Sequence, residues 1–290
     1  MKASVCFLMI AGLIAAASPL QAREDVERRS VQAAAAPDPA EQLLDLARML
    51  RANDLHGMLR ASVPPRHYQE LRLAYEVQRL EPSSESDRNE FAEHLGKLNA
   101  PDAVEQLMAE IEPKLAEARP KAPAAIMMGL GALQIALMSE DNKLSPEQRE
   151  SLQNALPGFQ SWVTRTDFLS SQSMRQALSL IAGAVQSTGI QDLDQLKQWS
   201  FEQTLAQAGR VLAAGKQALL IYGLDPDAIA DSLRVEVLAV EGDRARVRST
   251  ITLFDAPISA EHELVLLDGR WYAKDFAKHW TIHHDKQAQR

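Results

Sequence analysis

Three side chains near the C-terminus could carry out acid–base chemistry if a sheet brings them together. Ser249, His262 and Asp275 lie in three consecutive segments whose apolar residues recur at every second position. With a four-residue loop before the segment of His262 and a two-residue turn after it, the three side chains fall in one row, about 5 Å apart at Cβ. Asp275 would then orient His262, which could act as a general base toward Ser249 or a bound water.

The same row also has a structural interpretation, which we favour. Three polar side chains near a sheet edge can satisfy one another, because an unpaired buried polar group costs about 1–3 kcal/mol. A nucleophilic serine normally stands on an exposed turn beside donors for an oxyanion, and Ser249 lies in the middle of a segment. We therefore expect no catalytic residue, and we keep a small-molecule-binding or hydrolytic pocket built on a His262–Asp275 dyad as the alternative.

A second group of histidines stands at the very end of the chain. If the tail is helical, His279 and His283 share one face at a spacing that metal ligands use. The interpretation that we favour is a polar tail in which Trp280 packs on the sheet. No metal site and no cofactor are therefore expected.

The segments that carry these residues predict an antiparallel meander. Turn signals separate four stretches of period two, at Glu241-Gly242-Asp243, at residues 254–257 and at Asp268-Gly269. This register also places Glu236, Arg248, Glu263 and Lys274 in one row of alternating charge, which would face solvent. The face of Val237 and Ala239 would pack on helices. The four expected strands are Leu233–Val240, Arg244–Leu253, Ile258–Leu267 and Arg270–Phe276.

Nearly two hundred residues before the sheet follow a helical period. Ser145 and Ser200 each precede a glutamine by three residues, which is the capping-box arrangement at a helix start. Ala124–Met138 is the most apolar stretch and is too short to span a bilayer, so we expect a central buried helix there. The fold class that follows is α+β, predominantly helical with a C-terminal four-stranded antiparallel meander. Helices are expected from Pro39 to about Leu50 and at about 64–80, 85–98, 101–118, 123–139, 146–165, 171–187 and 199–222.

The last fifty residues contain two short motifs of a known superfamily. Val240-Glu241-Gly242-Asp243-Arg244-Ala245-Arg246-Val247 and Leu267-Asp268-Gly269-Arg270-Trp271-Tyr272 are hairpins of its kind. They loosely resemble the C-terminal sheet of the cone-shaped α+β superfamily of nuclear-transport-factor-like and SnoaL-like domains. The resemblance covers under a fifth of the chain and implies a pocket between helix and sheet. It implies no particular reaction, because that superfamily hosts enzymes, binders and interaction modules.

The N-terminus has the three parts of a secretory signal peptide. Lys2 is followed by an uncharged apolar run, Val5–Ala17, and by Ala22 at the cleavage position. The only cysteine, Cys6, lies inside this segment. Cleavage would therefore leave a cysteine-free chain with no transmembrane anchor, in the periplasm or outside the cell.

The organisation and charge of the remaining chain limit its partners. We expect a signal peptide at 1–22, a flexible linker at 23–38, a helical region at 39–224, and at 225–290 an antiparallel sheet packed on the last helix, with a short tail. Loss of Lys2 leaves 30 basic and 39 acidic side chains, so the net charge would be −9. This charge argues against nucleic acid and anionic lipid as main partners. We expect a non-enzymatic module for an envelope protein or a small apolar ligand.

Overall fold

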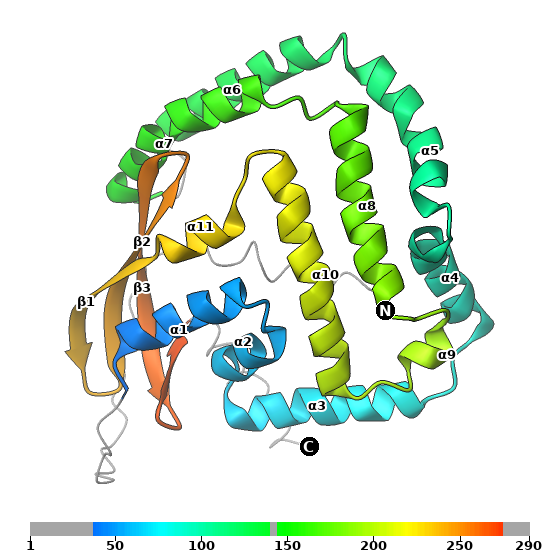
Figure 1. Cartoon of the computed structure of the whole chain (residues 1–290). Coiled ribbons are helices and arrows are strands. Elements are labelled where there is room, and N and C mark those ends of the chain that lie inside the picture. Colours follow the sequence, from blue (N-terminus) through cyan, green and yellow to red (C-terminus); the bar gives the residue numbers. More distant parts are fainter. Residues whose placement is uncertain (1–36, 140–143, 275–290) are drawn as a thin grey trace.

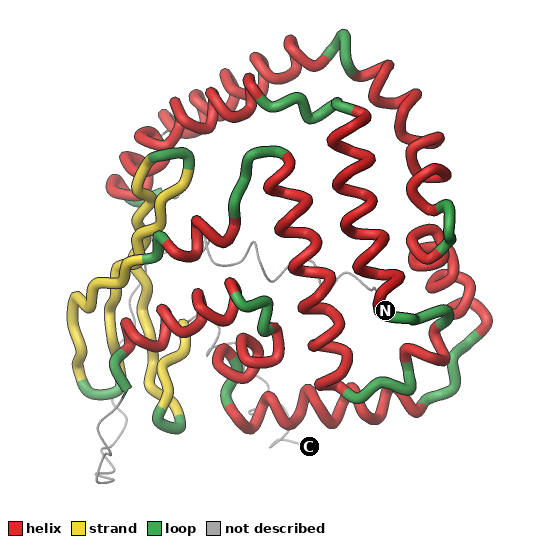
Figure 2. Tube along the Cα trace, viewed as in Figure 1, coloured by secondary structure: helices red, strands yellow, loops and turns green. Residues whose placement is uncertain are grey.

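The computed structural model describes residues 37–139 and 144–274, and within them it confirms an α+β fold that is mostly helical. Figure 1 shows helices α3 to α7 following one another along an outer arc, with α8 and α10 side by side inside it and the sheet closing one side. Strands gather at that one side only, as the colouring of Figure 2 shows. The elements are α1 (Pro39–Arg51), α2 (Leu55–Ser62), α3 (Pro65–Leu80), α4 (Glu85–Asn99), α5 (Ala103–Ala118), α6 (Ala122–Met138), α7 (Pro146–Arg165), α8 (Ser171–Ser187), α9 (Leu193–Leu196), α10 (Phe201–Ile221), α11 (Pro226–Asp231), β1 (Arg234–Glu241), β2 (Arg244–Leu253), β3 (Ala256–Leu267) and β4 (Arg270–Ala273).

Helix starts follow the local signals of the sequence. The side chains of Ser145 and Ser200 accept hydrogen bonds from the backbone of Gln148 and Gln203, and both glutamines reach back, so both capping boxes are confirmed. Three short helices were not expected, namely α2, α9 and α11. Each has an aspartate whose carboxylate accepts from the first turn, and such local capping stabilises helices too short to show a clear period.

The sheet has the expected order, β1-β2-β3-β4, and the register of its last pair is the expected one. The first pair is correct from Arg234 to Val237, where Val237 faces Val247. A bulge at Leu238 then shifts the register by one residue, so that Ala245 lies opposite Val240 rather than Ala239. The expected three-residue first loop is therefore wrong, because Glu241 pairs with Arg244 and only two residues turn the chain.

The second loop is also shorter than expected, with two residues instead of four. Leu253 pairs with Ala256, so only Phe254 and Asp255 form the turn, both with positive φ. Such a two-residue turn is usually made by Asn-Gly or Asp-Gly, and Phe-Asp is not its sequence signature. The register between β2 and β3 consequently differs by two residues from the expected one, and Arg248 lies opposite Glu261 instead of Glu263.

A shift of two residues keeps every side chain on its face. Arg248 forms ion pairs with Glu236 and Glu261, while Lys274 forms one with Glu263, and these side chains are between 35% and 65% exposed. The opposite face holds the buried cluster of Ala245, Val247, Leu264 and Trp271, against which Leu43 of α1 packs. The separation of charged and apolar faces is confirmed for these residues, but the expected burial of the apolar face is wrong at Val237, which is 38% exposed, and Tyr272 on the charged face is only 3% exposed.

Helices contact the sheet at several places. The main contacts are those of α7 with β3, of α1 with β1 and β2, and of α11 with β2, whereas α10 contacts α8, α2, α3 and α11. The N-terminal helix α1 also covers the edge of β4. There the side-chain amide of the buried Gln42 donates to the carbonyl oxygen of Trp271 and accepts from its backbone N–H at 2.9 Å. Gln42 thereby satisfies edge groups that another chain could otherwise pair with.

Replacing Gln42 by alanine should lower the free energy of unfolding by about 2 kcal/mol, because both backbone groups of the buried Trp271 would lose their partner. Urea denaturation followed by circular dichroism measures the change. Gln42→Glu is the matched control, because a carboxylate can still accept from the Trp271 N–H but repels its carbonyl oxygen. Equal stability of wild type and Gln42→Ala would show that α1 does not hold the β4 edge.

Candidate functional site

Ser249 and His262 lie close together in the sheet, as the sequence indicates, although the register between β2 and β3 differs from the expected one. His262 lies directly opposite Val247, and Ser249 lies opposite Ala260, so the two polar residues are diagonal neighbours on one face. The Oγ of Ser249 and the Nε2 of His262 are 2.7 Å apart. Asp275 lies outside the described residues, as do His279 and His283.

The chemistry available to this pair is limited by its surroundings. Burial lowers the pKa of His262, so the imidazole is neutral at pH 7. The Ser249 hydroxyl also lies 3.4 Å from the carbonyl oxygen of Ala260, so its one proton has two acceptors within reach. Neither of the two cavities described below includes Ser249 or His262 in its lining. The geometry shows a hydrogen-bonded pair of polar side chains in a sheet, and the structural interpretation of the whole row, with Asp275, stays a prediction.

The lowered pKa of His262 gives a pH dependence of stability with a defined sign. Below the ordinary histidine pKa of about 6.5 the unfolded chain binds a proton more readily than the folded chain does. The free energy of unfolding should therefore fall as the pH drops from about 7.5 through 6.5 toward the lowered pKa, by at most about 1.4 kcal/mol per pH unit for one group. Urea titrations between pH 7.5 and 5 should show a steeper fall for wild type than for His262→Gln, whose amide can still bond to Ser249. Parallel curves would contradict a buried neutral imidazole.

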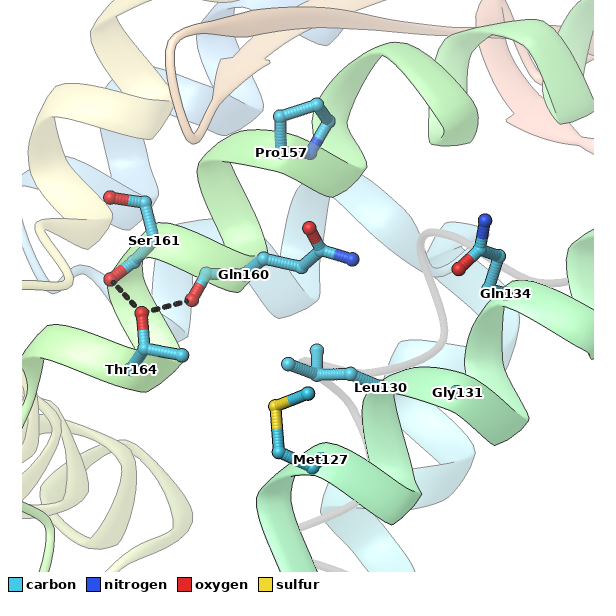
Figure 3. A pocket seen from close by; sticks show the side chains of 8 residues that line it. All are labelled: Met127, Leu130, Gly131, Gln134, Pro157, Gln160, Ser161 and Thr164. Atoms are coloured by element: carbon cyan, nitrogen blue, oxygen red, sulfur yellow. Dashed lines mark hydrogen bonds between the residues drawn. The ribbon is translucent and has the colours of Figure 1, made fainter. Parts of the chain in front are cut away.

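A groove lies between α6 and α7, beside an apolar surface. Its volume is about 470 Å³. Figure 3 shows Met127 and Leu130 reaching from α6 toward α7, and Gln160 reaching from α7 into the space between the helices. The hydroxyl of Thr164 is turned back on its own helix, where it donates to the carbonyl oxygen of Gln160 at 2.8 Å. The lining consists of Met127, Leu130, Gly131, Gln134, Pro157, Gln160, Ser161 and Thr164.

Helix α6 itself differs from its expected role as a central buried helix. Leu137 is buried, and Ile126, Leu130 and Leu133 are partly buried, on the side that faces α7. On its other side the large apolar side chains are exposed, with Met128 at 76% and Ile135 at 73%. The expectation of burial was wrong because α7 is the main packing partner of α6 in the described chain.

A second cavity, of about 460 Å³, lies between α1 and α11. Two arginines line it, but both guanidinium groups have carboxylate partners. Arg48 pairs with Glu41 and Asp45, and Arg51 pairs with Asp231. The cavity therefore offers no uncompensated positive charge to an anionic ligand.

Sequence reasoning did not single out the residues of the α6–α7 groove. The one available signal is Gln134, the single polar residue in an otherwise apolar helix. The residues of α7 that complete the groove lie more than twenty positions away, and nothing in their spacing marks them as neighbours of α6.

Two further features of the described residues bear on function. Within residues 37–139 and 144–274, no three histidine, cysteine or acidic side chains are grouped so that they could hold a metal ion. In the same ranges no single helix is long and apolar enough to cross a bilayer. Helices α5 and α6 would reach that length and composition only together, and they are bent by 73° at their junction.

Comparison with known proteins adds no relative, since no family model, curated protein or solved structure matches this chain.

Proposed function

We propose that this chain is an exported, non-enzymatic interaction module that binds a partner through α6. The observation that carries the proposal is the apolar character of both sides of this helix. An α-helix that is apolar all round belongs in a protein core or another apolar environment, and α6 contains no charged residue over its 17 positions. Large exposed apolar patches on soluble proteins mark interaction sites.

The composition of the exposed side fits a contact surface. Met127, Met128 and Met138 supply three of its large side chains, with exposed fractions from 64% to 76%. Methionine is flexible and polarisable, and it is enriched in protein interfaces. The adjoining groove, with its row of amide and hydroxyl groups, adds polar contacts at the border of the apolar surface.

Export is the second part of the proposal and is supported by the N-terminal segment. A basic residue, an apolar run of signal-peptide length and Ala22 precede a charged stretch that begins at Arg23. Periplasmic extracts should contain a chain whose mass corresponds to a start at or near Arg23. A chain of full mass in the cytoplasmic fraction would contradict export.

Binding through α6 is tested in cells with a photoreactive amino acid. A benzophenone side chain placed at Met128 should give one discrete protein adduct on illumination, identified by mass spectrometry. The control is the same side chain at Ala92 of α4, which is also exposed but lies on a helix rich in charged residues. The absence of an adduct at Met128, or equal adducts at both positions, would overturn the proposal.

The alternative is a small-molecule or hydrolytic pocket that uses the His262–Asp275 dyad. The hydrogen bond between Ser249 and His262 favours it, as does the resemblance of the sheet to a superfamily with a pocket between helix and sheet. His262→Ala and Asp275→Asn variants that stay folded but change ligand binding would support this alternative. Variants that only lower the melting temperature would make the row structural.

A further inference from the structure

Among the three turns of the described sheet, only the β2–β3 turn contains no glycine. Each turn has two residues, and in the other two turns Gly242 or Gly269 takes a positive φ. In the β2–β3 turn, Phe254 (φ 52°) and Asp255 (φ 61°) both take it. Aspartate tolerates this region, but a positive φ is rare for a bulky residue such as phenylalanine. This turn is therefore the most strained of the three connections.

Helix α7 supplies the contacts that hold the strained turn. The backbone of Phe254 lies against Gly158, where no side chain separates the helix from the turn. The ring of Phe254 packs on those of Phe159 and Trp162, with ring centres 5.4 and 5.2 Å apart. A strained backbone persists only where its surroundings hold it, so the closed turn depends on α7.

Opening this turn divides the sheet into two parts that fit together again in a second copy. β3 and β4 follow the turn as one hairpin, whose own Asp268-Gly269 turn has a favourable sequence. Outside the turn, β3 pairs with β2 and contacts α7, and Gln42 of α1 bonds to Trp271 of β4. All of these contacts reform when the hairpin of one copy joins the other copy. The exchange relieves two strained turns and loses only the contacts of Phe254 with α7.

We propose that the Phe254-Asp255 turn is a strained hinge that α7 holds closed, and that its open form is an exchanged dimer. In this dimer, β3 and β4 of each copy complete the sheet of the other. Short loops under strain favour such an exchange of identical elements. The closed chain is the major form while Gly158 holds the turn, and the dimer forms when that contact is lost at high protein concentration. The proposal is independent of the proposed function, because no residue of α6 takes part in it.

Cysteines placed across β2 and β3 distinguish exchange from other kinds of association. Thr250 lies opposite Ser259, and their hydroxyl oxygens are 2.8 Å apart. Opposed residues of an antiparallel pair lie within the Cα separation that a disulfide spans. Full-length chains with Cys6→Ser receive either Thr250→Cys or Ser259→Cys. In a mixture of the two variants, these cysteines face each other when β2 of one chain pairs with β3 of the other.

The mixture is unfolded in urea and refolded at hundreds of micromolar under mild oxidation. With the native turn, we expect at least tenfold more disulfide-linked heterodimer than homodimer from either variant alone. With Phe254→Asn/Asp255→Gly, which has the preferred sequence for this turn, the heterodimer should fall at least tenfold. Phe254→Ala is the matched control, because it removes the same ring but leaves a turn without glycine, so the heterodimer should persist.

Each contrary result of this experiment overturns a stated part of the proposal. A native-turn mixture with no more heterodimer than homodimer overturns the exchange. Equal yields from the native turn and the Asn-Gly turn overturn strain as its cause. A dimer in sedimentation velocity whose cysteines stay unlinked overturns the exchanged arrangement. If Phe254→Asn/Asp255→Gly does not refold, Asp255→Gly replaces it, since this variant keeps the ring of Phe254.

Substitutions in α7 test whether this helix holds the turn closed. Gly158→Ala displaces the turn without altering its sequence. Without urea, the cysteine mixture that carries Gly158→Ala should give at least tenfold more heterodimer than the mixture that carries Gly183→Ala, whose Cβ meets no atom within 4 Å. Phe159→Ala removes one ring contact of the turn and should act in the same direction, which keeps the test valid if Gly158→Ala does not fold. Yields equal to that of Gly183→Ala would show that α7 does not hold the hinge.

Discussion

Replacing Gly158 by alanine should lower the free energy of unfolding by about 3 kcal/mol, one of the two largest effects expected for a single substitution here. A Cβ at this position of α7 would stand 2.1 Å from the carbonyl oxygen of Phe254 and 2.8 Å from its Cβ. The nearest atom belongs to the backbone of the β2–β3 turn, so rotation of a side chain cannot relieve the contact. The turn would have to lift from the helix.

Lifting the turn would also break an aromatic cluster. The ring of Phe254 lies 5.4 Å from that of Phe159 and 5.2 Å from that of Trp162 between ring centres. Phe254 and Asp255 both keep a positive φ, which is unfavourable for residues other than glycine and persists only where the surroundings hold it. The close packing of the Phe254 backbone against Gly158 therefore stabilises the strained turn.

Urea denaturation of Gly158→Ala measures the loss, with Gly183→Ala as its control. Gly183 also lies inside a helix, α8, and no described atom lies within 4 Å of its Cβ position. Alanine there should raise stability by up to about 1 kcal/mol, because it is the better helix former. If both variants were more stable than wild type, the close contact between Gly158 of α7 and the β2–β3 turn would be contradicted.

Replacing Lys216 by methionine should cost about 3 kcal/mol. Lys216 is 7% exposed, and its ammonium group donates to the carbonyl oxygens of Leu50 and Arg51 at 3.0 and 3.2 Å, and to the carboxylate of Asp227. One side chain thus joins α10 to the end of α1 and to the start of α11. Methionine keeps the length of the side chain but removes the donor to the carbonyl oxygen of Arg51 and to the carboxylate of Asp227, while the carbonyl oxygen of Leu50 still accepts from the backbone N–H of Asn53 at 3.1 Å. Breaking a buried charge pair costs about 3–5 kcal/mol. We expect the lower end of this range because the carboxylate of Asp227 is partly exposed and can be hydrated once Lys216 is replaced.

Two further variants separate the parts of this interaction. Asp227→Asn should cost about 1 kcal/mol, because Lys216 still donates to both carbonyl oxygens. Arg88→Met removes one partner of an exposed ion pair with Asp194 and should change stability by less than about 1 kcal/mol. Chemical denaturation of the three variants under the same conditions gives the comparison. Equal losses for Lys216→Met and Arg88→Met would show that Lys216 does not hold the three helices together.

Local features of this protein could be determined from the sequence because they depend on neighbouring residues. The capping boxes at Ser145 and Ser200 follow from side chains three residues apart. The Asp268-Gly269 turn, with positive φ at both residues, follows from the conformations that these two residue types allow. The two faces of the sheet follow from a period of two, which is why the pairing of Ser249 with His262 survived a wrong loop length.

Other features were decided only by the tertiary structure, because they depend on residues far apart in the chain. The Phe254-Asp255 turn has no sequence signature and is held by its contact with Gly158, almost a hundred residues earlier. The apolar composition of α6 indicated only that the helix would be buried. It could not indicate that α7 packs on one side of the helix while the other side stays exposed. The groove between these helices could not be foreseen for the same reason. Burial is a property of the whole arrangement of elements, whereas period and capping are properties of a few adjacent residues.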